Sequence, residues 1–215
     1  IQPAKQLLND LKSRHPALGY SHPEWLVQSW KNSFGPDQTN NLLEWNNQPP
    51  PTYARVNRLR TTAGRMREPW EHAGVEPSLD TFARAPTTEV YRLLRHQPFV
   101  SLESFRAGLF YVQDPSTFLA VEQLDPKPGE TILDLCAAPG GKTLLMAQKM
   151  NDTGRIVATD SSRDRLKLVE ENCLRLGVKS VETRLKPRDL PGEFDKVLVD
   201  APCSNTGVMR RRVDL

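Results

Sequence analysis

Residues 131–143 constrain the fold of this 215-residue chain more than any other stretch. They read Thr-Ile-Leu-Asp-Leu-Cys-Ala-Ala-Pro-Gly-Gly-Lys-Thr, which begins as a short apolar run typical of a buried parallel strand. The run ends in a Gly-rich turn, and residues that favour a helix follow from Lys142. A strand, such a turn and a helix in this order form a ligand-binding loop at the carboxyl end of a sheet, because Gly140 and Gly141 let the backbone approach a ligand closely. An ordinary tight loop is the alternative.

Two common nucleotide-binding motifs do not fit this turn. A phosphate loop of the form G-x-x-x-x-G-K-T requires glycine where Cys136 stands, and the dinucleotide motif G-x-G-x-x-G is absent. An acid about 20 residues after the glycines, Asp160, ends the next apolar run and can accept both hydroxyls of a ribose. A nucleoside without a pyrophosphate fits this pattern, and S-adenosyl-L-methionine is such a ligand, whose sulfonium also suits Asp134. A helix N-cap is the alternative role for Asp160.

Strand and helix patterns alternate through the last part of the chain. We expect helices at 114–124, 142–150 and 162–176, and strands at 131–135, 155–159, 180–185 and 194–199. This alternation predicts an α/β fold with a Rossmann-like, doubly wound parallel sheet. Because a sheet that ends after this fourth strand keeps an apolar edge, we expect the chain to be truncated there.

Two smaller parts are expected before that sheet. The first is helical, with patterns at 3–14, at 23–34 and from Asp37 through Trp45. A stiff proline linker follows, and then a small α+β module with strand patterns at 53–59, 89–94 and 109–112 and a helical pattern at 61–72. We therefore divide the chain into residues 1–48, 49–112 and 113–215.

The excess positive charge of the chain, +3, comes entirely from the middle module. Residues 53–112 hold nine Arg, no Lys and six acids, whereas acids and bases are equal in number elsewhere. Arginine side chains bind phosphate and stack on bases, so we expect this module to contact RNA. A solvated surface is the alternative.

The three cysteines, Cys136, Cys173 and Cys203, show no C-x-x-C spacing, so neither a metal site nor a disulfide framework is expected. No apolar run approaches the roughly 18 residues that span a bilayer and no signal peptide is visible, so we expect a cytoplasmic protein without a membrane partner. Cys173 lies on an apolar helix face and is expected to serve packing. Cys203 lies in a polar loop before three arginines, at 210–212, which favours a thiolate.

Two motifs carry a family resemblance: Asp-Leu-Cys-Ala-Ala-Pro-Gly-Gly-Lys-Thr at 134–143 and Asp-Ala-Pro-Cys-Ser at 200–204. Together they resemble the Sun/Fmu-type RNA cytosine-C5 methyltransferases. Further matches are Arg-Val-Asn at 55–57, Gly-Leu-Phe-Tyr-Val-Gln-Asp at 108–114 and Tyr-Ser-His-Pro-Glu-Trp-Leu at 20–26. The last of these leans towards the bacterial ribosomal-RNA branch of that family.

The resemblance implies roles for individual residues. The donor, S-adenosyl-L-methionine, would be held by Cys136, Ala137, Ala138, Pro139, Gly140, Gly141, Lys142, Asp160 and Asp200. Asp200 would also hydrogen-bond the ring-nitrogen edge of cytosine, and Cys203 would assist breakdown of a covalent cysteine adduct. The attacking cysteine of the family lies in a Thr-Cys-Ser element after the next strand, beyond residue 215. Where the family usually has an acid that contacts adenine, this chain has Lys186, and Asp189 is the expected substitute.

We therefore expect the N-terminal and central parts of an S-adenosyl-L-methionine-dependent RNA (cytosine-5) methyltransferase that acts on ribosomal RNA. Without the attacking cysteine, the chain alone should be inactive. The alternative is a catalytically inactive RNA-binding paralogue that retains the donor fold.

Overall fold

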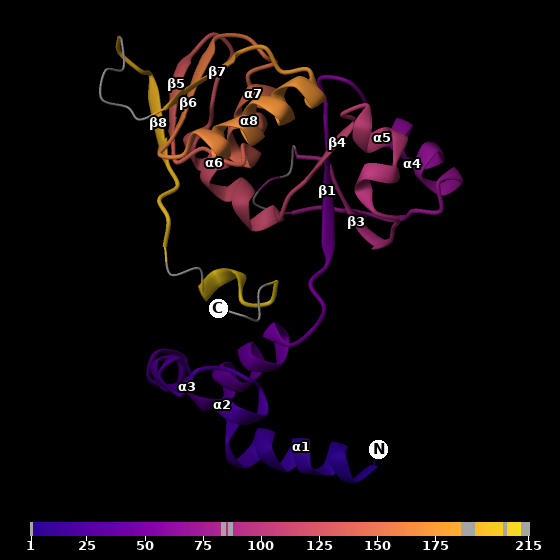
Figure 1. Cartoon of the computed structure of the whole chain (residues 1–215), viewed down its shortest axis with the longest axis vertical. Coiled ribbons are helices and arrows are strands. Elements are labelled where there is room, and N and C mark those ends of the chain that lie inside the picture. Colours follow the sequence, from indigo (N-terminus) through magenta and orange to yellow (C-terminus); the bar gives the residue numbers. More distant parts are fainter. Residues whose placement is uncertain (1, 83–84, 86–87, 186–191, 204–205, 212–215) are drawn as a thin grey trace. The chain divides into compact units, whose positions relative to one another are not determined.

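The computed structural model divides the chain into two compact units (Figure 1). One unit consists of residues 1–50 and 203–215, and the other of residues 51–202. The structure describes residues 2–82, 85, 88–185, 192–203 and 206–211. The division into three domains at residues 48 and 112 stays a prediction.

The first unit is helical, with α1 (Gln2–Arg14), α2 (Pro16–Gly19), α3 (Glu24–Asn46) and the short η3 (Thr206–Val208). The sequence predicted two helices in place of α3, separated at Gly35, and the backbone does break there with a φ of +78°. The helix resumes at Pro36, because proline is tolerated in a first turn. Ala17, Tyr20, Val27 and Leu43 form the core of this unit.

The second unit contains an antiparallel sheet with strand order β2-β3-β1-β4. Its strands are β1 (Thr52–Val56), β2 (Glu76–Asp80), β3 (Val90–Arg95) and β4 (Phe110–Val112). The associated helices are α4 (Ala63–His72), η1 (Phe99–Ser101) and α5 (Glu103–Arg106). The indole of Trp70 lies edge-on to Tyr91 and Phe110, at ring distances of 5.1 and 5.3 Å, and anchors the core. The edge strand β2 was not predicted, because Pro77 and the exposed Leu79 weaken its alternating pattern.

A parallel sheet with strand order β7-β6-β5-β8 follows in the same unit. Its strands are β5 (Thr131–Leu135), β6 (Arg155–Asp160), β7 (Val181–Leu185) and β8 (Lys196–Val199). The helices are η2 (Pro115–Thr117), α6 (Phe118–Leu124), α7 (Gly141–Lys149) and α8 (Arg163–Leu176), and Figure 1 shows α7 and α8 against the strands. The predicted doubly wound parallel sheet is confirmed. The Gly-rich turn follows the carboxyl end of β5, Asp200 follows that of β8, and Asp160 is the last residue of β6.

Hydrogen bonds join the antiparallel module to the end of α8. The Asn57 amide donates to the carbonyl oxygens of Gly108 and Leu176 at 2.7 and 2.9 Å. Arg60 donates to the same Leu176 oxygen, also at 2.9 Å. The Arg175 guanidinium in turn lies 4.0 Å from the ring centre of Phe105. The last carbonyls of a helix have no partner within it, so these side chains satisfy α8 and fix it to the module.

Gly108 lies where the module approaches the end of α8 closely. Its φ is +68°, and a Cβ atom there would overlap the carbonyl oxygen of Arg175. Gly74 has a similar φ of +70° but open space around it. We expect Gly74→Ala to lower the free energy of unfolding by about 1 kcal/mol through backbone strain alone. Gly108→Ala adds the overlap and should cost about 3 kcal/mol or more.

Urea unfolding of the two variants measures this difference. Equal losses in the two variants would contradict the close approach of module and helix.

Candidate active site

The turn after β5 is tied to its neighbours through the backbone. The amide of Ala137 donates to the carbonyl oxygen of Thr159 in β6, at 2.8 Å. Gly140 adopts a φ of +103°, which favours glycine. At Gly141 a Cβ atom would lie only 3.2 Å from Nε2 of Gln113. Glycine is therefore favoured at position 140 by the backbone conformation and at position 141 by the close approach of Gln113.

A cavity of about 190 Å³ lies between the turn and the segment that leads out of β4. Its lining residues come from the turn, from strand ends and from η2: Tyr111, Val112, Gln113, Thr117, Asp134, Cys136, Ala137, Ala138, Pro139, Gly141, Lys142 and Asp200. Seven of the nine predicted donor-binding residues thus line one cavity, and Gly140 and Asp160 do not.

Asp134 brings a buried carboxyl group to this cavity. It is 1% exposed, and Oδ2 accepts a hydrogen bond of 2.6 Å from the Thr143 hydroxyl. Oδ1 is buried and has no hydrogen-bond partner in the described part of the chain. Burial raises the pKa of Asp134 to about 7, although the bond from Thr143 and the charge of Lys142 oppose the shift. This carboxyl group therefore changes its charge near neutral pH.

Lys142 and Asp200 form an ion pair across the cavity, from the ammonium Nζ to the carboxylate Oδ2. Lys142 lies in the first turn of α7, and Asp200 directly follows β8. The lysine side chain is mostly buried, whereas the Asp200 side chain is about half exposed, at 55%. The pair holds Asp200 at the cavity while leaving part of its carboxylate open to solvent.

Asp160 supports the turn from the end of β6. It is 4% exposed, Oδ1 accepts from the backbone amide of Ser162 at 3.1 Å, and Oδ2 accepts from that of Ala138 at 3.4 Å. Ser162, rather than Asp160, caps α8 through its side chain. Arg165, which the sequence did not single out, lies 3.6 Å from Asp160 and donates to the carbonyl oxygen of Ala138 at 2.9 Å. A contact of Asp160 with a ribose stays a prediction.

The cysteines occupy three different settings. Cys173 is buried in the core, as predicted, and burial raises the pKa of its thiol to about 12. Cys136 lines the cavity and is partly buried. Cys203 is exposed and belongs to the first unit, so its predicted role stays a prediction. Arg210, also in that unit, lies 4.4 Å from the ring centre of Trp45 and donates to two carbonyl oxygens of residues 48 and 49.

Three of the residues named from the sequence, Lys186, Asp189 and Arg212, lie outside the described residues.

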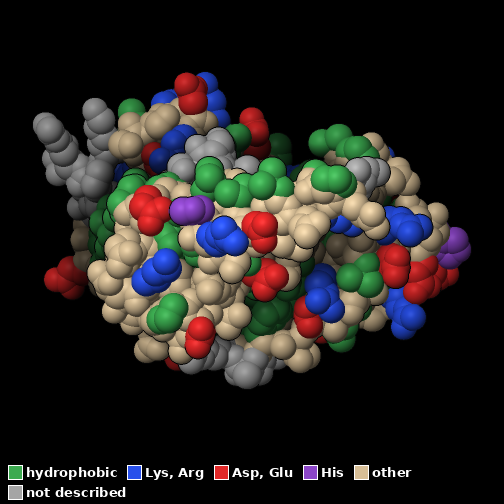
Figure 2. All heavy atoms as spheres, turned by 90° about the horizontal axis from the view of Figure 1, so that it is seen from below, with side chains coloured by type: hydrophobic (Ala, Val, Ile, Leu, Met, Phe, Trp, Pro, Cys, Tyr) green, Lys and Arg blue, Asp and Glu red, His purple; other side chains and the backbone are tan. Residues whose placement is uncertain are grey.

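One arginine of the middle module, Arg55, is buried, which corrects the sequence-based expectation that it contacts RNA. Arg55 is 1% exposed, and Arg60 donates to carbonyl oxygens of residues 107 and 176. Arg55 donates to the side-chain oxygens of Gln113 and Gln148 and is not available to RNA, whereas Arg60 remains exposed. Six other module arginines are exposed: Arg58, Arg65, Arg67, Arg92, Arg95 and Arg106. On the face shown in Figure 2, basic and acidic side chains are interspersed.

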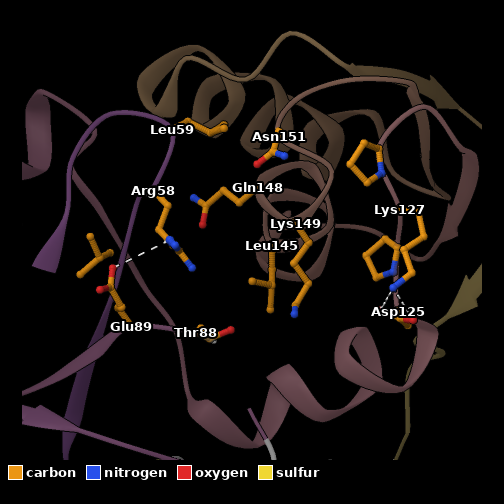
Figure 3. Close-up of a pocket in the computed structure, with 13 residues that line it drawn as sticks. Arg58, Leu59, Thr88, Glu89, Asp125, Lys127, Leu145, Gln148, Lys149 and Asn151 are labelled. Carbon is orange, nitrogen blue, oxygen red and sulfur yellow. Dashed lines mark hydrogen bonds and ion pairs between the residues drawn. The ribbon is translucent and has the colours of Figure 1, made fainter. Parts of the chain in front are cut away.

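A larger cavity, of about 460 Å³, lies at the other end of α7 (Figure 3). Three of its cations lie beside acids, in the pairs Arg58–Glu89, Lys127–Asp125 and Lys149–Glu122, at 4.0, 2.7 and 2.7 Å. Residues 125–128, which line it, precede β5, so this cavity lies at the amino edge of the parallel sheet. Sheets of this type bind ligands at the carboxyl edge, so the smaller cavity is the candidate active site.

Within the described part of the chain, no three His, Cys, Asp or Glu side chains lie together as metal ligands. No helix there has the length and apolar character needed to cross a membrane.

Two family models match the sequence. Residues 121–215 match the model described as 16S rRNA methyltransferase RsmB/F. Residues 22–85 match the ferredoxin-like domain of RsmF/B-like methyltransferases. The first match contains the Gly-rich turn and Asp200, and the second contains the strands β1 and β2 of the antiparallel sheet.

Individual relatives agree with these matches. The chain is 33% identical over 208 residues to the probable ribosomal RNA small subunit methyltransferase B of Bacillus subtilis, covering 94% of this chain and 45% of the relative. It is 40% identical over 204 residues to the ribosomal RNA small subunit methyltransferase B of Serratia proteamaculans, covering 91% and 46%. The chain thus spans less than half the length of these curated relatives.

Solved structures show the same architecture. The crystal structure of PH0851 matches with a TM-score of 0.81 and 34% identity, covering 95% of this chain and 45% of that one. A methyltransferase homolog protein from Pyrococcus horikoshii matches with a TM-score of 0.77 and 31% identity, covering 92% and 65%. The Rossmann-like methyltransferase fold and the small α+β fold before it are confirmed.

The buried carboxyl group of Asp134 predicts a pH-dependent stability. A raised pKa in the folded state means that stability is fully present below about pH 4 and is lost as the pH rises to about 7. Asn at this position can still accept from Thr143 but does not ionise. We expect Asp134→Asn to gain stability relative to the wild type between these pH values, by up to about 4 kcal/mol, and to differ by a constant amount above pH 8.

Urea unfolding at several pH values measures this effect. Asp164→Asn is the control, because the pKa of exposed Asp164 is lowered by Lys167 and its ionisation is complete at neutral pH. A stability difference for Asp134→Asn that stays flat between about pH 5 and 8 would rule out the buried ionisation.

Proposed function

This chain belongs to the RsmB/RsmF family of methyltransferases, and from that premise we propose that the protein transfers a methyl group from S-adenosyl-L-methionine to carbon 5 of a cytosine in ribosomal RNA. The proposal rests on the cavity that joins the Gly-rich turn to Asp134 and to the ion pair of Lys142 and Asp200. The names of the relatives in Bacillus and Serratia supply the RNA class, the small-subunit ribosomal RNA.

The residues around the turn suit a positively charged nucleoside donor. When bound, S-adenosyl-L-methionine supplies a methyl group activated by its sulfonium. The unpaired Oδ1 of Asp134 offers an acceptor for a cation such as the donor's ammonium group. Gly140 and Gly141 leave the backbone accessible, and Asp160 is the acid assigned to the ribose hydroxyls. These residues would hold the donor together with Cys136, Ala137, Ala138, Pro139 and Lys142.

Carbon 5 of cytosine is a poor nucleophile, so the base must be activated. Attack of a thiolate on carbon 6 forms a sulfur–carbon bond and moves an electron pair towards carbon 5, which can then accept a methyl group. Asp200 hydrogen-bonds the ring-nitrogen edge and stabilises this adduct, and Lys142 keeps the Asp200 carboxyl group in place. Cys203 assists removal of the proton from carbon 5, after which the double bond re-forms and the thiolate leaves carbon 6.

The attacking thiolate is assigned to a second cysteine. The family has it in a Thr-Cys-Ser element, and the 215 residues here contain no such element. The activity is therefore proposed for the protein that carries this chain together with that element. A base within folded RNA must also be turned out of its stack to reach the cavity, and the exposed arginines of the module can hold the neighbouring phosphates.

Replacement of Cys203 tests the covalent mechanism. In the full-length protein, Cys203→Ala should accumulate a covalent complex with RNA, because breakdown of the adduct is slowed while attack is retained. The complex is measured as a slowly migrating band on a denaturing gel. Cys173→Ala is the control, since its thiol is buried and has a pKa of about 12, and it should give no such band. A gel without a shifted band for Cys203→Ala would count against the assigned role.

Replacement of Asp160 tests the donor site. We expect Asp160→Ala to weaken S-adenosyl-L-methionine binding by at least about tenfold, because a buried carboxylate that contacts both the turn and the ribose is lost. Calorimetric titration measures the dissociation constant, and the melting temperature shows whether the variant is folded. Asp164→Ala, an exposed acid four residues away, should bind as the wild type does. Unchanged affinity in Asp160→Ala would refute the assignment.

A further inference from the structure

The side-chain amide of Gln113 lies in the wall of the active-site cavity, against Gly141. It is 8% exposed. Its Oε1 accepts from Nε of Arg55 at 2.8 Å, and its Nε2 donates to the hydroxyl of Thr117, also at 2.8 Å. A primary amide has two N–H groups, so one of them is left for a further acceptor.

The neighbours fix which way this amide points. Arg55 can only donate, so the oxygen of the amide must face it. The Thr117 hydroxyl donates to the carbonyl oxygen of Asp114 at 2.6 Å, so it accepts from Gln113. The hydrogen bonds therefore run in one direction, from Arg55 through Gln113 and Thr117 to Asp114. The amide nitrogen is held on the side of Gly141 and the cavity.

Arg55 is an unusual partner for a contact that serves packing alone. It is fully buried, it donates to the amide oxygens of Gln113 and Gln148, and its Nη2 has no hydrogen-bond partner in the described part of the chain. None of the ion pairs among the described residues involves it. Burial lowers the pKa of Arg55 to about 9, so it remains charged at neutral pH. A buried cation without a carboxylate costs free energy that an apolar contact would not.

We propose that Gln113 orients the ligand in the active site by donating its remaining N–H to an acceptor oxygen of the bound molecule, with Arg55 as the positioning residue that fixes this amide. The inference rests on the proposed function. Two oxygens of the required chemistry take part in that reaction, the carboxylate of the methyl donor and the carbonyl oxygen of cytosine. Both are hydrogen-bond acceptors, and the experiment distinguishes them.

The arrangement solves an electrostatic problem. A guanidinium placed in the cavity would repel the positively charged methyl donor. Gln113 keeps the charge of Arg55 behind a neutral amide, while a hydrogen bond from a cation to its oxygen strengthens the N–H as a donor. The cavity thus gains a strong donor without gaining a positive charge.

Gln113→Glu in the full-length protein tests the proposal. Glutamate keeps the length and the acceptor for Arg55 but removes the N–H groups. Loss of one hydrogen bond to a bound ligand should weaken either donor binding or RNA turnover on the order of 10- to 100-fold. If the acceptor is the donor carboxylate, the dissociation constant of S-adenosyl-L-methionine rises in calorimetry. If it is the cytosine carbonyl, that constant stays unchanged and kcat/KM for the RNA falls.

Gln148→Glu is the matched control. Gln148 accepts from the same Arg55, its amide donates to Oδ1 of Asn57 at 3.0 Å, and it lines the other cavity (Figure 3). Glutamate there keeps the acceptor for Arg55, so the bond between β1 and α7 is retained. It loses an internal N–H bond, but none that faces the active site. We expect both parameters to stay within about twofold of the wild type. Equal effects of the two substitutions on both parameters would overturn the proposal.

Thr117→Val gives a second variant if Gln113→Glu does not fold, as its melting curve would show. It removes the acceptor that holds the Gln113 nitrogen, so the same parameter should change in the same direction by a smaller factor. Unchanged parameters in this variant would also overturn the proposal. Measurements on the wild type distinguish failure of the proposed function from failure of the Gln113 inference. Wild-type protein that neither binds the methyl donor nor methylates RNA contradicts the proposed function, and this inference with it. Normal wild-type activity that Gln113→Glu leaves unaltered contradicts this inference alone.

Discussion

Arg55 in strand β1 and Asn57 directly after it donate hydrogen bonds to helices that pack on the parallel sheet, to the amide oxygen of Gln148 in α7 and to the carbonyl oxygen of Leu176 in α8. These bonds join the antiparallel sheet to the parallel sheet, and both sheets belong to the second unit. The candidate active-site cavity depends on them, because one of its walls, residues 111–117, continues from the antiparallel sheet, and the Gly-rich turn belongs to the parallel one. A change in these hydrogen bonds would therefore move one wall of the cavity relative to the other, even though no residue of the turn had changed.

The parallel sheet could be predicted from sequence because its signals are local and strong. Its inner strands are continuous apolar runs, and Ser162 and Gly177 mark the ends of α8 as a cap and a left-handed residue. The edge strand β2 lacks such signals. It contains Pro77, its register shifts beside that residue, and it is a strand only because β3 pairs with it. Partners that lie distant in sequence decide such a segment, and no local pattern shows them.

In the candidate site too, some features could be predicted from local motifs and others depend on tertiary contacts. The turn and Asp200 belong to contiguous motifs, so their place at the carboxyl edge followed from the strand order. The contacts of Arg55 did not, since they join residues 58 and 93 positions apart. Composition instead suggested that the arginines of the module face RNA, and for the buried Arg55 this is wrong. An arginine in a strand that a second domain covers has the same local sequence as one that faces solvent, and only tertiary structure distinguishes the two.

The charge of the cavity depends on its two acids, Asp134 and Asp200, and on the cation near them, Lys142. Lys142 neutralises Asp200, so the charge that remains near the turn depends on the ionisation of Asp134. Burial keeps this carboxyl group partly protonated at neutral pH, and a cation beside Oδ1 would favour its ionised form. Arg55 contributes no opposing charge to the cavity lining, since Gln113 stands between them. A site of this kind is close to neutral when empty and acidic when a cationic ligand enters, which avoids holding an unpaired buried carboxylate between turnovers.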